Sequence, residues 1–228
     1  MNDIVCDFLS FGKKYTIIAV SVKGDYHNIN QDSYLIEAIG MNFCVSVADG
    51  LGSAIKSDVG SKAACQTVPD LLLHDNPLAN IGEIIAKWKK SLCGNINAYD
   101  TTLKFFSLID GKIRIGKIGD GCVCTLIDGE YEELDNETKF LNHTDSLLSY
   151  DPEKSYKEIE HSQCNECTIL LATDGFSEDM VSEKRCEFLK ECSFDIDTNP
   201  QIRPIVHIGQ NTIGQRGQSG SIGNTRYN

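Results

Sequence analysis

The sequence lacks any apolar run long enough to cross a membrane. No stretch approaches the roughly 20 consecutive apolar residues that a membrane-spanning helix needs. Residues 1–14, MNDIVCDFLSFGKK, place an acid ahead of the apolar part and have no basic segment there, unlike a secretory signal. We therefore predict a cytoplasmic protein that has no membrane partner.

Basic residues are scarce. Lys and Arg together number 21, against 33 Asp and Glu, and the formal net charge is −12. A surface of this sign repels the phosphate backbone of nucleic acids, which argues against an obligate nucleic-acid partner. The same surplus of acids suits an enzyme that holds divalent cations among carboxylates.

The cysteines lack the spacing of a structural zinc site. Ten are scattered through apolar segments, and Cys164 and Cys167 form a single CxxC pair. A structural zinc site needs two such pairs or additional histidines. We interpret the cysteines as small apolar side chains of a protein in a reducing compartment.

Acidic residues are absent from the end of the chain. Residues 198–228 contain no Asp or Glu but several Gly, Gln, Asn and Ser. No core element is evident there, and the composition favours a flexible or poorly packed terminus. We divide the chain into one folded domain, residues 1–197, and an atypical C-terminal segment, residues 198–228.

Apolar periodicity predicts strands and helices in separate groups. The expected strands are 15–22, 32–39, 41–49, 102–110, 112–119, 122–128 and 167–175. The expected helices are 53–73, 79–96 and 177–192, and residues 130–163 are interpreted as a loop-rich insertion. This order is typical of an α+β fold, with antiparallel sheet and helices outside it.

Three buried-type strands end in the dipeptide Asp-Gly, at Asp49, Asp120 and Asp174. A single Asp-Gly is usually a turn, which is our interpretation of the pairs at Asp110 and Asp128. Carboxylates at rigid strand ends supply the oxygen ligands that Mg²⁺ and Mn²⁺ prefer, and glycine lets a backbone carbonyl approach as well. The pattern therefore predicts a divalent metal site.

Five segments carry a resemblance to a known family, and they read HNINQDSY, VADGLGSAIKSDVGSKAA, DTTLKFFSL, KIGDGCV and LLATDGFSE. Over about residues 15–192 the chain resembles the metal-dependent protein phosphatases of type 2C, of the bacterial kind. The resemblance implies a four-layer α-β-β-α sandwich of two antiparallel sheets flanked by helices. It also implies that a water activated by two Mn²⁺ or Mg²⁺ ions hydrolyses phosphoserine or phosphothreonine in a protein substrate. A Ser/Thr kinase is a further implied partner.

The resemblance also implies roles for the acids. Asp49 matches the bridging ligand of both metals, and the carbonyl of Gly50 a ligand of one. Asp174 matches the second carboxylate of the other metal. Asp120 matches the site of a weak third ion, with Glu178 as a neighbour.

Further positions match the same motifs. Asp32 matches a catalytic acidic position, and Gln31 stands where many relatives have Glu. His27 stands where many have an arginine that binds the substrate phosphate, so it is a candidate phosphate ligand or general acid. A structural histidine beside a strand is the alternative. Thr101 and Thr102 match a motif that packs near the metal-bearing strands.

The end of the chain departs from the family pattern, in which a late Asp supplies a third carboxylate to the first metal. The tail offers GQNT from Gly209 and GNT from Gly223, neither with an acid, and the nearest acids are Asp195 and Asp197. A second hypothesis is therefore a catalytically weak phosphatase-like domain that binds and regulates a kinase or phosphoprotein. A nuclease or another metal-dependent hydrolase is a third, which the acidic surface disfavours.

Overall fold

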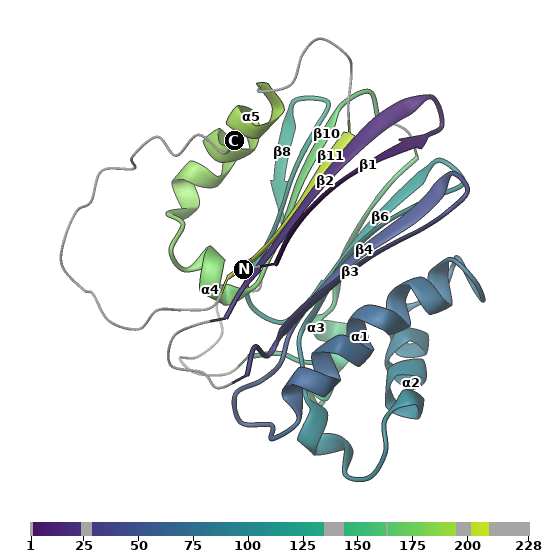
Figure 1. Cartoon of the computed structure of the whole chain (residues 1–228), viewed down its shortest axis with the longest axis vertical. Helices are drawn as coiled ribbons and strands as arrows, with labels where there is room; N and C mark the ends of the chain where they lie inside the picture. The colour runs from purple at the N-terminus through teal and green to yellow at the C-terminus, as the bar shows by residue number, and fades with distance from the viewer. Residues whose placement is uncertain (1, 24–28, 135–143, 163, 195–201, 210–228) are drawn as a thin grey trace, which may run out of the picture.

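A computed structural model describes residues 2–23, 29–134, 144–162, 164–194 and 202–209. Two β-sheets face each other, with helices on their outer sides (Figure 1). Sheet A is six-stranded, with the order β1-β2-β11-β10-β7-β8, and sheet B is five-stranded, with the order β3-β4-β5-β6-β9. The α+β class expected from the sequence is confirmed.

Sheet A joins the two ends of the described chain. Its strands are β1 (Asn2–Ser10), β2 (Lys13–Val22), β7 (Cys122–Ile127), β8 (Glu130–Glu133), β10 (Cys167–Ala172) and β11 (Ile202–Gly209). The pairs β1–β2, β7–β8 and β7–β10 are antiparallel, whereas β11 runs parallel to both β2 and β10. The register between β11 and β2 skips Arg203 and Pro204, as expected where proline has no N–H to donate.

Sheet B is antiparallel throughout. Its strands are β3 (Asp32–Ile39), β4 (Asn42–Asp49), β5 (Leu103–Ile109), β6 (Lys112–Ile118) and β9 (Lys157–His161). Asp110 and Gly111 take positive φ of 51° and 76° between β5 and β6, which is the backbone of a tight hairpin turn. This pair is therefore the turn that the sequence predicted.

Helices cover the outer faces of both sheets (Figure 1). They are α1 (Ser57–Leu72), α2 (Ile81–Ser91), η1 (Ile96–Tyr99), α3 (Pro152–Ser155), α4 (Asp174–Ser177), η2 (Ser182–Lys184) and α5 (Arg185–Phe194). Helix α1 contacts β3, β4 and α2 on sheet B, and α5 contacts β7 and β10 on sheet A. Within the described residues, no helix has the length and apolar composition needed to cross a bilayer.

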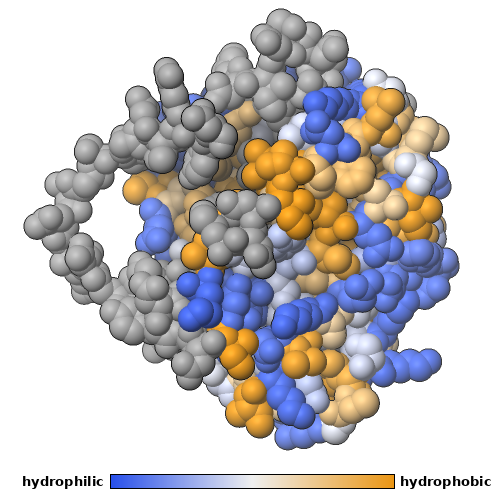
Figure 2. Space-filling model, viewed as in Figure 1, coloured by the Kyte–Doolittle hydropathy of each residue, from blue (hydrophilic) through white to orange (hydrophobic). Residues whose placement is uncertain are grey.

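Apolar side chains form one layer between the sheets and one under each set of helices. Tyr15 and Phe106 lie in the layer between the sheets, and Trp88 of α2 lies in the layer under the helices on sheet B. Apolar side chains also remain exposed on the β1–β2 hairpin, where Val5 is 68% and Leu9 is 74% accessible. Figure 2 shows apolar surface gathered over this hairpin.

The structure differs from the sequence predictions at four places. The region 130–163 contains β8, α3 and β9, so it is not simply a loop-rich insertion. The helix predicted over 177–192 is divided among α4, η2 and α5. Strand β1 was not predicted at all. A terminus without a core element is wrong for 202–209, because β11 has hydrogen-bonded neighbours on both sides and its parallel pairings make sheet A mixed.

Candidate metal centre

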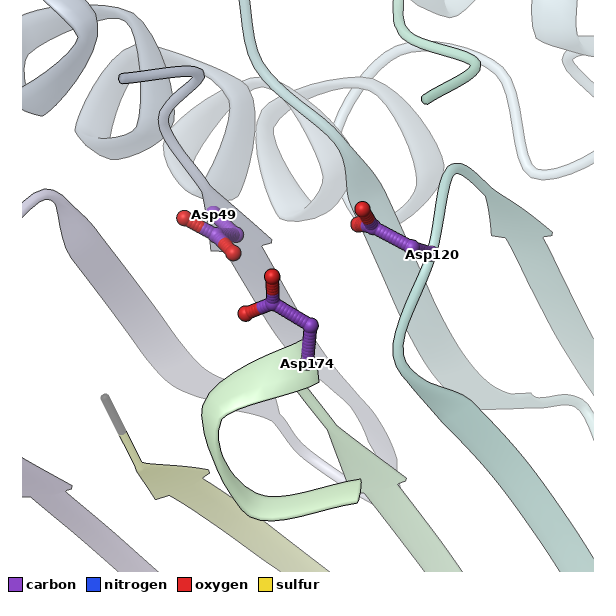
Figure 3. Close-up of side chains that lie close together, drawn as sticks. All are labelled: Asp49, Asp120 and Asp174. Carbon is purple, nitrogen blue, oxygen red and sulfur yellow. The ribbon is translucent and has the colours of Figure 1, made fainter. Parts of the chain in front are cut away.

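Three carboxylates from distant parts of the chain meet at one end of the sheets. Asp49 ends β4, Asp120 lies in the turn between β6 and β7, and Asp174 begins α4, two residues past the end of β10. One oxygen of each lies within 4.8 Å of the others, and all three side chains are half-buried. Figure 3 shows the Asp49 and Asp174 carboxylates turned toward each other. We call Asp49, Asp120 and Asp174 the carboxylate cluster.

Two buried threonines fix the main chain at Asp49. The N–H of Thr102 and the hydroxyl of Thr101 each donate to the Asp49 carbonyl, both at 2.8 Å. The Asp49 N–H in turn donates to Thr102 Oγ1 at 3.0 Å. The motif that the sequence placed near the metal-bearing strands thus holds the first of the three acids.

Gly50 sits where no side chain fits. Its N–H donates to the Gln31 carbonyl at 3.1 Å, and a Cβ at this position would lie 2.5 Å from the Ser57 carbonyl oxygen. The Gln31 side chain donates to Ser57 Oγ at 2.6 Å, which ties the start of α1 to the same corner. Glycine is therefore required here by the close approach of α1.

The turn that carries Asp120 is held from both sides. Thr144 Oγ1 donates to Asp120 Oδ2 at 2.7 Å. The buried Lys117 ammonium donates to the carbonyls of Gly121 and Leu134, each at 2.9 Å. These bonds set the direction from which Asp120 approaches the other two acids (Figure 3).

A fourth carboxylate, Asp32, lies behind the cluster. It is opposite Asp49 in the register of β3 and β4, and it is 5% exposed. Thr173 Oγ1 donates to Asp32 Oδ2 at 3.5 Å, while Asp32 Oδ1 has no hydrogen-bond partner among the described residues. A buried carboxylate oxygen without a donor is costly unless a cation or water satisfies it.

Burial and neighbouring acids raise the pKa values of Asp32 and Asp49. Burial, followed by the charge of Asp174, raises the pKa of Asp32 to about 7. Burial, together with the charges of Asp32 and Asp174, raises the pKa of Asp49 to about 10. Carboxyl groups this strongly perturbed in one place are typical of functional sites.

Comparisons with known proteins agree with this geometry. A family model described as "Protein phosphatase 2C" matches residues 25–201. The chain belongs to the protein phosphatase 2C family. A comparison with curated protein sequences finds no significant match.

Solved structures of the phosphatase 2C type share the fold. The catalytic domain of the serine/threonine phosphatase PstP, in complex with 2 manganese ions, is 18% identical, with a TM-score of 0.55 over 75% of this chain and 82% of that one. Stp1 from Staphylococcus aureus is 13% identical, with a TM-score of 0.52 over 77% and 87%. The S. agalactiae serine/threonine phosphatase is 15% identical, with a TM-score of 0.52 over 86% and 87%.

The residues present in this phosphatase 2C chain fit a hard divalent cation. All the converging donors are carboxylate oxygens, which suit Mg²⁺ and Mn²⁺ rather than the softer metals that thiolates select. The unpartnered Asp32 Oδ1 and the raised pKa values indicate that no described group compensates the charged form of these carboxylates fully. The individual metal-ligand roles of Asp49, Gly50, Asp120 and Asp174 stay predictions.

Other predicted positions are outside the described residues. These are His27, Asp195, Asp197 and most of the acid-free tail, so the roles assigned to them stay predictions. Glu178 follows Asp174 by one helical turn, and its N–H donates to the Asp174 carbonyl at 2.8 Å. This bond closes the turn on which Asp174 sits.

Sequence reasoning missed one side chain at this phosphatase 2C centre. Lys104 is 0% exposed on β5, two residues after Thr102. The signal was present, because a lysine interrupts the otherwise apolar run TLKFFSL, and an unpaired lysine is seldom fully buried. The family resemblance assigned no role to this position.

Proposed function

We propose that this chain is a metal-dependent serine/threonine protein phosphatase. The observation that carries the proposal is the meeting of Asp49, Asp120 and Asp174 within 4.8 Å, in a chain that the phosphatase 2C family model matches. Two Mn²⁺ or Mg²⁺ ions are the proposed cofactors, with a weaker third at Asp120. When bound, such ions supply the positive charge that activates a water and neutralises phosphate oxygens.

The protein contributes position and charge. Thr101 and Thr102 hold Asp49 through its backbone, so this acid needs little rearrangement to act as a ligand. Asp32 is opposite Asp49 in the register of β3 and β4 and is the proposed catalytic acid position. His27 is proposed to engage the substrate phosphate or to protonate the leaving oxygen of the serine or threonine.

The substrate, partner and location belong to the same proposal. Phosphoserine and phosphothreonine of a protein are the proposed substrates, and a Ser/Thr kinase is a proposed partner in signalling. All ten cysteines are free thiols, which supports a reducing compartment such as the cytoplasm.

A second function is a binding domain with weak catalysis. The observation that favours it is the absence of acids in 198–228, which removes the late carboxylate that the family resemblance calls for. Losing one carboxylate from a dinuclear site takes away both a ligand and a charge. Such a domain would still bind a phosphoprotein or a kinase and regulate it.

Turnover with added Mn²⁺ separates the two functions. We expect hydrolysis of an aryl phosphate and of a phosphothreonine peptide, and a fall of at least about 100-fold in Asp49→Asn and in Asp174→Asn, because each removes a ligand charge. Asp110→Asn is the matched control, since Asp110 lies in the β5–β6 turn outside the cluster. A folded wild type without turnover at any Mn²⁺ concentration favours the binding domain.

A further inference from the structure

A lysine lies buried beside the carboxylate cluster. Phe106 and Leu108, which alternate with it on the same face of β5, belong to the layer between the sheets, so Lys104 extends into that layer at the end where the cluster lies. Its Nζ donates to Thr102 Oγ1 at 3.5 Å. The same oxygen accepts the Asp49 N–H at 3.0 Å, which places the ammonium one hydrogen-bonded group away from that acid.

The hydrogen bond to Thr102 leaves the charge of Lys104 only partly satisfied. An ammonium has three donors, and a neutral hydroxyl satisfies only part of the demand of a buried cation. A Cβ on Gly121, the residue after Asp120, would lie 2.9 Å from Lys104 Cε. Thr102 links the ammonium to the Asp49 backbone. Lys104 is therefore placed next to two of the acids that a divalent cation would need.

We propose that Lys104 is a positioning residue, a fixed internal counter-ion that holds the acids together without metal and lowers their affinity for divalent cations. The inference rests on the proposed function, since it takes the carboxylate cluster as a cation site. The ammonium repels an incoming Mn²⁺ and competes with it for the negative charge of the carboxylates. Mn²⁺ therefore binds more weakly than it would to the same carboxylates without Lys104.

A second buried lysine provides a matched control. Lys117 is directly opposite Lys104 in the register of β5 and β6 and is 3% exposed. Its ammonium donates to the backbone carbonyls of Gly121 and Leu134. Replacing Lys117 removes a buried charge of the same kind from the neighbouring strand, where it is bonded to carbonyls.

The test is the Mn²⁺ dissociation constant of the full chain by titration calorimetry, with unfolding temperatures in EDTA and in Mn²⁺. We expect Lys104→Met and Lys104→Gln to bind Mn²⁺ at least about tenfold more tightly than wild type, since both remove the charge. Gln retains a donor for Thr102, so equal effects of both variants identify charge as the cause. Lys117→Met also removes a buried charge, but it loses the bonds that hold the Asp120 turn, so it should bind Mn²⁺ no more tightly than wild type.

The outcomes are distinct. Equal or weaker Mn²⁺ binding by the two folded Lys104 variants overturns the counter-ion role and leaves the proposed function standing. Lys104 variants that fold in Mn²⁺ but not in EDTA support the counter-ion role, because the metal ion then supplies the positive charge that the ammonium supplied. Lys104 variants that fold in neither condition overturn the counter-ion role. If neither wild type nor the Lys104 variants bind Mn²⁺, the proposed function fails as well.

Discussion

At the scale of single residues, the neighbouring acids Asp32 and Asp49 are a source of instability in the metal-free protein. They are opposite each other in adjacent strands, and Asp32 is buried while Asp49 is half-buried. Their raised pKa values mean that the folded chain favours the protonated carboxyls. The site is thus built to hold cations rather than to stabilise the fold by itself.

This arrangement predicts an unusual pH dependence. Between the unfolded pKa near 3.9 and the folded values, about 7 for Asp32 and about 10 for Asp49, the folded state binds more protons than the unfolded state. The free energy of unfolding in EDTA therefore falls as pH rises, by up to about 1.4 kcal/mol per pH unit for each proton. Above about pH 7, Asp49 alone contributes.

Asp49→Asn isolates this effect. Urea unfolding in EDTA from about pH 5 to about pH 8 should show a shallower loss of stability in the variant and a higher stability than wild type at the alkaline end. Added Mn²⁺ should stabilise wild type but not the variant. Parallel pH curves for the two proteins would show that Asp49 titrates normally.

At the scale of elements, the position of Asp49 depends on how tightly α1 packs against η1. A Cβ on Gly60 would lie 1.8 Å from the Tyr99 carbonyl oxygen. Trp88 on α2 donates its indole N–H to the Gly60 carbonyl at 3.0 Å. Because η1 leads directly into Thr101 and Thr102, a shift here is transmitted to the Asp49 backbone.

We expect Gly60→Ala to cost about 1–3 kcal/mol or more, because the added methyl meets backbone rather than a movable side chain. It should also weaken Mn²⁺ binding. Gly52→Ala is the control, since nothing lies within 4 Å of a Cβ there, and its stability should stay within about 0.5 kcal/mol of wild type. Thermal unfolding measures the stability of both variants. Equal stabilities of Gly60→Ala and Gly52→Ala would refute the tight contact between α1 and η1.

The sequence predicted strands correctly where the local pattern of apolar residues matches the burial in the structure. Strand β3 was predicted with the observed bounds, and β4 began one residue early, because alternation and the turn at Gly40 define that hairpin locally. Strands β9 and β11 were missed because they are polar or contain proline. Each is a strand because it pairs with neighbouring strands: β9 pairs with β6, and β11 pairs with β2 and β10.

At the scale of the whole molecule, the fold brings three chain segments to one end of two sheets. The sequence predicted that Asp49, Asp120 and Asp174 each end a strand, and the family resemblance assigned them to one site; in the structure Asp49 ends β4, and the other two lie two residues past β6 and β10. Their distances follow from the pairing of β10 with β7 and from the facing of sheets A and B, which no local pattern contains. Lys104 was visible as a lysine in an apolar run, but the residues that it faces are set by the packing of the two sheets.

The central claim is that these three acids jointly bind divalent ions. The most direct measurement is an anomalous difference map from a crystal of the full chain grown or soaked with Mn²⁺. The account predicts a peak bounded by Asp49 and Asp174, with a weaker one on the Asp120 side. Peaks confined to other parts of the molecule, or none at saturating Mn²⁺, would contradict it.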